Sequence, residues 1–189
     1  MSRRRWRSSD LAVNGSGHLQ AKKNGAAPLR LLKRKFDGVV VGIDPSLRGT
    51  GVAVLRCKSG TPRLVFSATL KTKGTPTAAL GQIAQAIENI CKQYAPTAAA
   101  IEETIFVQNN KTAITLGTAR GAAMATLALN QVECVGFAPT RIKQSITGHG
   151  RASKEQMSAM TKTLLGLSDP LPFDEADAAA AALCFIFAY

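Results

Sequence analysis

Residues 38–55, GVVVGIDPSLRGTGVAVL, decide the fold of this chain. The stretch contains an apolar run, one acidic residue, a turn rich in Pro, Ser and Gly, and a second apolar run. Residues 39–43 are expected to form a strand buried on both faces, because β-branched side chains pack well on a pleated surface. Asp44 ends this strand, where open α/β sheets usually bind their ligands. Asp also starts many ordinary turns, so this stretch alone leaves both interpretations of Asp44 open.

A mixed sheet is predicted from the elements that follow. The second and third strands are joined by short connections containing Gly, which suit antiparallel hairpins. Helices separate the later strands, and such crossovers make these strands parallel to the first. The sequence therefore predicts an α/β fold with a five-stranded sheet, three antiparallel strands and then two parallel ones, flanked by helices. The expected elements are strands at 50–56, 63–70, 98–101 and 132–137, and helices at 76–94 and 109–130.

Three further helices are expected after the fifth strand. A Gly-rich stretch at 148–150 ends the first of them. Ser153 and Gln156 have the spacing of a capping box, which predicts that the second begins there and runs to about residue 165. The third opens with acidic residues, which the helix dipole favours. These helices are expected to begin at Pro139, Lys154 and Asp174.

Four acidic residues are expected to meet at one edge of this sheet. If the fourth strand lies beside the first, Asp44 and Glu102 end neighbouring parallel strands, while Asp174 and Asp177 share one helix face. Like charges this close repel unless cations compensate, and carboxylate oxygens suit Mg²⁺ or Mn²⁺. Paired ions held in this way activate a water and stabilise the leaving oxygen of a phosphoryl displacement. Each residue alone has a simpler explanation, but their combination in this order predicts such catalysis.

Charge divides the chain into two parts. The formal net charge is +12, which indicates a polyanionic partner. Residues 1–37 hold 10 Lys/Arg and 2 Asp/Glu, and residues 38–189 hold 14 and 10, so the two parts carry +8 and +4. We interpret residues 1–37 as a flexible basic arm and residues 38–189 as the catalytic domain. Within the arm, Trp6 is a candidate to stack on a base. An organellar transit peptide, or an upstream start without a selected role, are the alternatives for the arm.

Cysteine and histidine offer no separate metal or disulfide site. The cysteines are far apart, with no paired spacing for zinc, and are expected to be reduced core residues of an intracellular protein. The two histidines, His18 and His149, are too few and too distant for a site of their own. The apolar end at 178–189 is shorter than the ~20 residues that span a bilayer. The four cysteines are Cys57, Cys91, Cys134 and Cys184.

A stripe of small residues lies along the helix expected at 109–130. Its members recur at every fourth position and allow another backbone to approach closely. The neighbour is either the sheet or a second subunit, and the sequence leaves both open. The stripe consists of Ala113, Gly117, Gly121 and Ala125.

Five stretches resemble the RuvC Holliday-junction resolvases of the ribonuclease H-like superfamily, and the resemblance extends over essentially residues 38–189. The resemblance implies a homodimeric, cytoplasmic bacterial endonuclease of DNA recombination and repair, associated with the nucleoid, that nicks opposed strands of a four-way DNA junction. It also implies Mg²⁺, with Mn²⁺ possible, at two ions per site, and the RuvAB branch-migration complex as a partner. Organellar import through the basic arm is the alternative location. The stretches are GIDPSLRGTGVAVL at 42–55, AIEETIF at 100–106, LGTARGAAM at 116–124, PTRIKQSITGHGRASKEQM at 139–157 and DEADAAAAA at 174–182.

The resemblance also assigns roles in the active site. The four acidic residues match the metal ligands of the family, and Glu102 rather than Glu103 takes the position directly after the strand. Lys143 and Lys154 match its active-site basic residues, whose ammonium groups bind the scissile phosphate or stabilise developing negative charge. The implied catalytic set is Asp44, Glu102, Asp174, Asp177, Lys143 and Lys154.

DNA contacts are the least regular part of the match. The family carries aromatic residues after the catalytic Glu that wedge against bases, and here Ile105 and Phe106 take these places, so Phe106 is the expected wedge. Gln108 stands where relatives often have a basic residue, so Lys111 or the arm is expected to take over a backbone contact. The implied DNA-binding residues are Phe106, Lys111, Arg120, Arg141, Lys143, Arg151 and Lys154.

Three other functions share some of these features. A phosphotransferase of the actin and sugar-kinase type also starts with a strand ending in G-x-D, but this chain has no second phosphate-binding hairpin and is short for two such domains. A non-catalytic junction-binding protein would share the fold and the charge, yet none of the four carboxylates is missing. A nuclease of the same fold with another nucleic-acid substrate, such as a transposase or an RNA-processing enzyme, is the most serious alternative.

Overall fold

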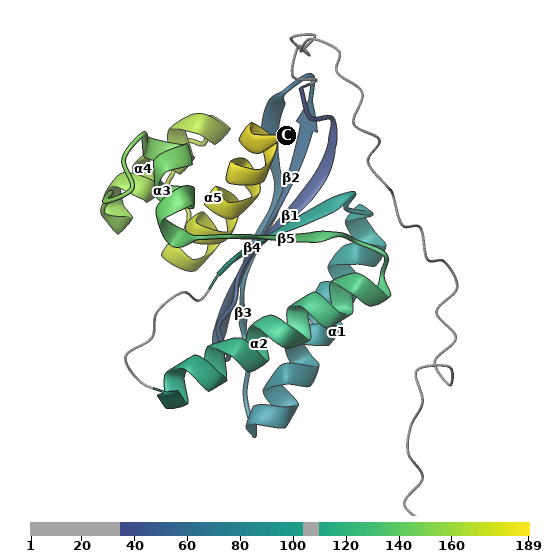
Figure 1. The fold of residues 1–189 in the computed structure, drawn as a ribbon. Helices are drawn as coiled ribbons and strands as arrows, with labels where there is room; N and C mark the ends of the chain where they lie inside the picture. The colour runs from purple at the N-terminus through teal and green to yellow at the C-terminus, as the bar shows by residue number, and fades with distance from the viewer. Residues whose placement is uncertain (1–34, 104–109) are drawn as a thin grey trace, which may run out of the picture. The chain divides into compact units, whose positions relative to one another are not determined.

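The computed structural model describes residues 35–103 and 110–189. Within them the chain forms five strands and five helices in the order shown in Figure 1. The strands are β1 (Gly38–Asp44), β2 (Gly49–Lys58), β3 (Thr61–Lys71), β4 (Ala98–Glu102) and β5 (Cys134–Phe137). The helices are α1 (Pro76–Tyr94), α2 (Asn110–Leu129), α3 (Pro139–Thr147), α4 (Lys154–Leu165) and α5 (Phe173–Ala188).

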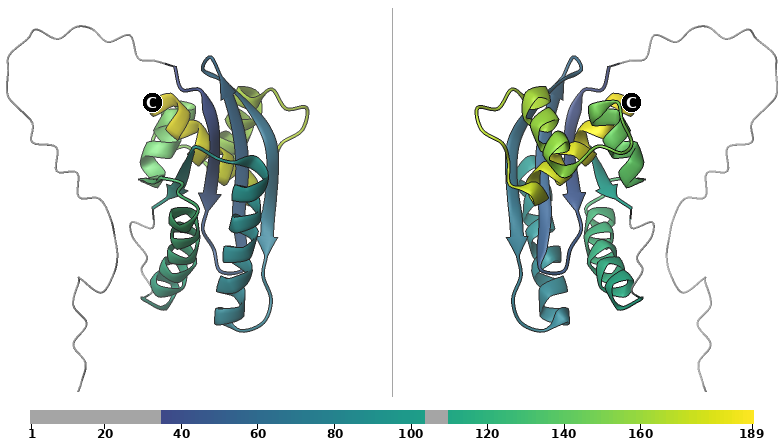
Figure 2. Two further views of the ribbon diagram at one scale, coloured as in Figure 1. Left: turned by 90° about the vertical axis from the view of Figure 1, so that its right-hand side faces the viewer. Right: turned by 90° about the vertical axis from the view of Figure 1, so that its left-hand side faces the viewer.

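The strands form one mixed sheet in the order β3-β2-β1-β4-β5. The pairs β1–β2 and β2–β3 are antiparallel, whereas β1–β4 and β4–β5 are parallel. Helices α3, α4 and α5 cover one face of the sheet, and α1 and α2 cover the other (Figures 1 and 2). This arrangement confirms the fold predicted from the sequence, and it brings the carboxyl ends of β1 and β4 to the same edge.

Each face of the sheet has its own apolar core. On the α5 side, alternate residues of the central strands, such as Val40 and Leu55, pack with Phe185 of α5. On the other side, Val41 and Ile83 belong to a second cluster that α1 and α2 close. This alternation is the period of two that a strand buried on both faces requires. It explains why the first strand has no polar residue before its end.

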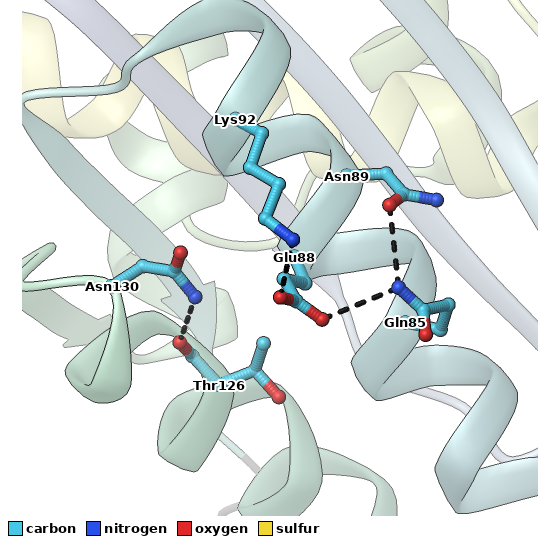
Figure 3. Close-up of polar contacts among 6 residues, drawn as sticks. All are labelled: Gln85, Glu88, Asn89, Lys92, Thr126 and Asn130. Atoms are coloured by element: carbon cyan, nitrogen blue, oxygen red, sulfur yellow. Dashed lines mark hydrogen bonds and ion pairs between the residues drawn. The ribbon is translucent and has the colours of Figure 1, made fainter.

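The outer surface of α1 is polar and forms bonds within the helix. Lys92 pairs with Glu88 at 2.6 Å, and Gln85 donates to Glu88 at 3.2 Å and to Asn89 at 3.3 Å (Figure 3). Asn130, at the end of α2, donates to the carbonyl oxygen of Thr126 in the same view. These contacts join residues three or four positions apart, which lie side by side on a helix surface.

Several element boundaries differ from the sequence expectation, and β2 and β3 are longer at both ends than expected. The fifth strand begins at Cys134 rather than at residue 132. Gln131 adopts a left-handed conformation with φ of 61°, and the Val132 N–H donates to the Leu127 carbonyl, so these residues close the end of α2. The last helix begins one residue early, at Phe173. The capping box of α4 is confirmed, because Ser153 and Gln156 each accept a hydrogen bond from the other's backbone N–H.

The small-residue stripe of α2 does not face the sheet. A Cβ added to Gly117 or Gly121 would meet no atom of the described chain within 4 Å, and both glycines are exposed. The buried face of α2 is formed instead by Ala119, Ala123 and their neighbours. The interpretation that the stripe packs on the sheet is therefore wrong, and contact with a second subunit stays a prediction.

Helix α5 lies directly on β1 and β2, and two glycines make this approach possible. A Cβ on Gly42 would lie 1.9 Å from the carbonyl oxygen of Ala178, and a Cβ on Gly51 would lie 1.9 Å from that of Asp174. Any side chain at either position would push the helix away. The bare backbone of these glycines thus fixes the height of α5 above the sheet.

Of the described helices, none is both long and apolar enough to cross a membrane.

We expect Gly51→Ala to destabilise the protein by about 1 to 3 kcal/mol, the usual cost of an overpacked core. Such a loss corresponds to a fall in Tm of about 2 to 4 °C per kcal/mol. Gly81→Ala is the matched control, because an added Cβ there meets nothing within 4 Å on the exposed side of α1. The control should be as stable as the parent or more stable, since Ala is the better helix former. Equal melting curves for both variants would contradict the close approach.

Candidate active site

Two carboxylates end neighbouring strands at the same edge of the sheet. Strands β1 and β4 pair in parallel up to Ile43 and Ile101, and Asp44 and Glu102 are the next residue of each. Both strands are buried up to this point, and Asp44 and Glu102 are half-buried. The side chains therefore emerge where the apolar sheet ends, as the sequence predicted.

Helix α5 brings two more carboxylates to this edge. Its first turn lies over β2, with the backbone of Asp174 against Gly51, and Gly51 is the register partner of Asp44. One carboxylate oxygen of Asp174 lies 3.5 Å from the Cβ position of Gly49. Asp177 follows one turn later, next to the residue that lies on Gly42. The contact of α5 with two glycines thus places both aspartates beside the end of β1.

Three of the four carboxylates line one pocket with two lysines. The pocket has a volume of about 250 Å³. Lys143 comes from α3 and Lys154 from the first position of α4, and the Lys154 ammonium pairs with Asp177 at 3.3 Å. Asp174 lies beside the pocket rather than in its lining. The lining consists of Asp44, Glu102, Asp177, Lys143, Lys154, Pro139, Ile142 and Met157.

Burial and neighbouring charges shift the pKa values of Asp44, Glu102 and Lys154. Burial, followed by the charges of Glu102 and the two α5 aspartates, raises the pKa of Asp44 to about 7. Burial and then Asp177 raise the pKa of Glu102, although Lys154 and Lys143 lower it. The pKa of Lys154 is raised, chiefly by Asp177. A desolvated cluster of like charges is unfavourable by itself, and positive charge in the pocket relieves it.

The donor set suits hard divalent cations. Carboxylate oxygens are the ligands that Mg²⁺ and Mn²⁺ prefer, and the burial of Asp44 favours a bound cation over a free carboxylate. Within residues 35–103 and 110–189, no three acidic, His or Cys side chains already stand close enough to hold one ion. The carboxylates therefore need to move closer together before they share one. The cysteines play no part, since all four are free and at least half-buried.

Glu175 is a residue of this region that the sequence reasoning missed. Its carboxylate accepts a hydrogen bond from Ser67 at 2.6 Å and a longer one from Thr69 at 3.5 Å, both on β3. The N-cap of α5 is Pro172, which makes no side-chain capping bond. Glu175 therefore ties the first turn of α5 to the sheet, between the two aspartates of that helix. No sequence signal indicates this bond, because its partners are more than 100 residues apart.

The other predicted DNA-binding residues lie outside the pocket. Arg120 faces Cys134 from α2, and its buried Nε has no hydrogen-bond partner in the described chain. Arg141 lies beside Cys184, and Arg151 lines a larger open hollow of about 610 Å³ that contains no carboxylate. Lys111 is exposed at the start of α2. Phe106, the predicted wedge, lies outside the described residues.

Comparison with known proteins gives one consistent match. The family model described as "Crossover junction endodeoxyribonuclease RuvC" matches residues 40–185. The protein of that name from Francisella tularensis subsp. novicida is 44% identical over 147 residues, which cover 77% of this chain and 86% of the relative. The same protein from Francisella philomiragia is 42% identical over 147 residues, with the same coverage.

Solved structures give the same result. Thermus thermophilus RuvC in complex with a Holliday junction substrate is 32% identical, with a TM-score of 0.76 over 80% of this chain and 94% of that one. The yeast mitochondrial Holliday junction resolvase Ydc2 is 11% identical, with a TM-score of 0.58 over 78% of this chain and 77% of that one. The second likeness shows a shared fold alone.

The raised pKa of Asp44 predicts how stability depends on pH without divalent cations. An acid whose pKa rises from 3.8 to about 7 on folding stabilises the folded state only below pH 4, and this contribution is lost as pH rises from about 4 to 7. The Asp44→Asn variant carries no charge at this position at any pH. With a chelator at pH 8 we expect this variant to raise Tm by about 2 to 8 °C, the range for a gain of about 1 to 2 kcal/mol in the free energy of unfolding.

The pH series supplies the check on this prediction. The difference in Tm between Asp44→Asn and the parent should shrink toward pH 4.5, which lies about half a unit above the pKa of Asp in an unfolded chain. Asp169→Asn, an exposed position, is the control and should leave Tm unchanged at each pH. A Tm difference for Asp44→Asn that is independent of pH would contradict the assigned burial and charge coupling.

Proposed function

Since the chain belongs to the RuvC family of crossover junction endodeoxyribonucleases, we propose that its carboxylate pocket is the metal-dependent centre that cuts the strands of a four-way DNA junction. The protein is a Holliday-junction-resolving endonuclease. The observation that carries the active-site assignment is the meeting of β1, β4 and α5. There Asp44 lies close enough to Glu102, Asp174 and Asp177 that their charges, together with burial, raise its pKa.

The four carboxylates are the proposed ligands of two Mg²⁺ ions, with Mn²⁺ as an alternative. Support comes from the oxygen donor set, from the burial that raises the pKa values of Asp44 and Glu102, and from the metal dependence of the family. When bound, the ions supply an activated water and stabilise the leaving oxygen of the phosphodiester. Asp44 and Glu102 hold fixed positions on the sheet. Asp174 and Asp177 close the ligand set from the helix above.

The two lysines are the proposed contacts of the scissile phosphate. Lys143 and Lys154 line the same pocket as the carboxylates, and an ammonium there attracts a phosphate and stabilises negative charge that develops on its oxygens. Lys154 pairs with Asp177 at 3.3 Å and remains largely exposed, so an incoming phosphate can reach its charge. Its role is to orient the phosphate beside the metal ligands.

A homodimer is part of the proposal. The exposed face of α2 carries the small-residue stripe, together with Ile114 and Leu129, which are 68% and 85% exposed. A second copy that packs there would bury these side chains and bring helix backbones close together at Gly117 and Gly121. Two active sites on one dimer suit paired cuts in opposed strands of a junction. Arg120, Arg141, Arg151, Lys111 and Phe106 remain proposed DNA contacts outside the pocket.

The remaining features of the proposal concern the cell. A cytoplasmic, nucleoid-associated location and cooperation with the RuvAB branch-migration complex are proposed on the basis of the bacterial relatives. The basic segment at the start of the chain is proposed to add contacts to DNA phosphates. Its charge of +8 over residues 1–37 supports this role.

Cleavage of a mobile four-way DNA junction tests the proposed function. With Mg²⁺ we expect paired, symmetric nicks in the junction and none in a matched linear duplex, and no cleavage in a chelator. Asp44→Asn should bind the junction as tightly as the parent and lower the cleavage rate by at least about 100-fold, the scale of a lost catalytic group. Normal cleavage by this variant would refute the site, whereas equal cleavage of linear duplex or RNA would refute the substrate.

Deletion of residues 2–34 tests the basic segment. The deletion should stop before Phe36, because its ring packs edge-to-face on Phe185 with centroids 5.4 Å apart and so belongs to the domain. It removes nine Lys/Arg and one Asp. Junction affinity should fall, and the plot of log K against log salt should become flatter by about 0.9 for each phosphate that the segment neutralises in the parent. An unchanged slope would show that the segment does not touch phosphates.

A further inference from the structure

Two arginines face each other across the hairpin of β2 and β3. Arg56 and Arg63 are register partners in this antiparallel pair, so their side chains lie on the same face of the sheet, and both are exposed. Like charges that are directly opposite across two strands destabilise the pair. The fold thus accepts an electrostatic cost at this position.

Nothing in the described chain neutralises these arginines. Neither has a carboxylate within ion-pair distance, since the ion pairs among residues 35–103 and 110–189 are Lys92–Glu88 and Lys154–Asp177. Lys92, by contrast, is a surface cation that is neutralised, because its ammonium lies 2.6 Å from the carboxylate of Glu88 (Figure 3). A charged edge strand discourages sheet-to-sheet aggregation, which explains Arg63 on β3. It does not explain Arg56, because β2 has a strand on each side.

Two lysines extend this charge around the hairpin. Lys58 follows Arg56 on the same face of β2, two residues later, and is exposed. Lys35 packs its aliphatic chain on the turn, because a Cβ on Gly60 would lie 2.7 Å from its Cδ. Asp37 is the acidic residue at this end, and its carboxylate accepts a hydrogen bond from the Ser59 backbone. The hairpin patch of Lys35, Arg56, Lys58 and Arg63 therefore keeps a net charge of +3 after Asp37 is counted.

The hairpin patch lies far from the carboxylates. Val39 is the register partner of Arg56, and Asp44 ends the same strand five residues later. At about 3.3 Å per residue, the two places are about 17 Å apart along β1. The patch also faces away from the pocket, because Arg56 is the partner of Val39, which packs in the core under α1 and α2, whereas α3, α4 and α5 line the pocket from the other face.

We propose that the hairpin patch of Lys35, Arg56, Lys58 and Arg63 is a second DNA-binding surface, which holds the phosphate backbone of duplex DNA at the end of the sheet far from the cleavage pocket and on its α1/α2 side. The inference rests on the proposed function for its substrate, but it assigns a surface that catalysis does not use. Its contacts are to phosphates, so it binds any duplex sequence and gives affinity rather than specificity. Bound phosphates neutralise the opposed arginines and thereby relieve the repulsion between them.

The test is junction binding by the full chain with the arginines changed to glutamine. For Arg56→Gln/Arg63→Gln we expect the slope of log K against log salt to become flatter by about 1.8, the value for two phosphates that are no longer neutralised. Affinity near physiological salt should fall about tenfold. A linear duplex should show the same loss, because the patch recognises the backbone. Cleavage at saturating junction and Mg²⁺ should stay within about twofold of the parent, since the pocket is unchanged.

Two controls separate this proposal from other causes. Lys162→Gln removes one positive charge on α4, on the opposite face of the sheet, and should leave the salt slope unchanged, whereas Arg56→Gln alone should flatten it by about 0.9. Arg56→Gln should not lower Tm, because it removes one of two opposed like charges. A salt slope equal to the parent's, or an equal effect of Lys162→Gln, would overturn the patch. Failure of the parent itself to bind a junction would instead overturn the proposed function.

Discussion

The contact between α5 and the two glycines of the central strands is the constraint on which the site depends. Gly42 and Gly51 leave no Cβ under the helix, so carbonyl oxygens of α5 lie where side chains would otherwise stand. Because Gly51 pairs with Asp44, this contact also sets the place of Asp174 relative to the strand end. A bulkier residue at either glycine would move two carboxylates at once. Packing and the geometry of the site are therefore one problem in this fold.

Electrostatics opposes what packing brings together. Burial, and then the charges of three neighbouring carboxylates, raise the pKa of Asp44 to about 7, so the site costs stability until positive charge enters it. Lys154 and Lys143 offset part of this cost, and the bond from Glu175 to Ser67 keeps the first turn of α5 on the sheet. Such opposition between stability and function is common at catalytic sites. The opposed arginines of the hairpin repeat the pattern at the other end of the same sheet.

The sequence predicted the sheet and its strand-end carboxylates because both depend on local pattern and on general rules of connection. The side chains of β1 alternate between two cores, and parallel strands end at one edge of a sheet. The sequence therefore sufficed to place Asp44 and Glu102 side by side. Glu175 could not be found, since its bond joins two side chains through the tertiary fold. The opposed arginines, by contrast, follow from the hairpin turn. Lys58 pairs with Thr61 across Ser59 and Gly60, so the same register places Arg56 opposite Arg63, and the register shift after Val54 lies beyond this pair.

Binding of Mn²⁺ to the pocket, measured by calorimetric titration of the full chain without DNA, tests the central claim most directly. We expect about two ions per chain for the parent, the number a two-metal site holds. Asp44→Asn and Glu102→Gln should each remove at least one of them, while Asp169→Asn, on an exposed surface, should bind as the parent does. Undiminished binding by the Asp44 and Glu102 variants would contradict the claim that β1, β4 and α5 meet to form the metal centre.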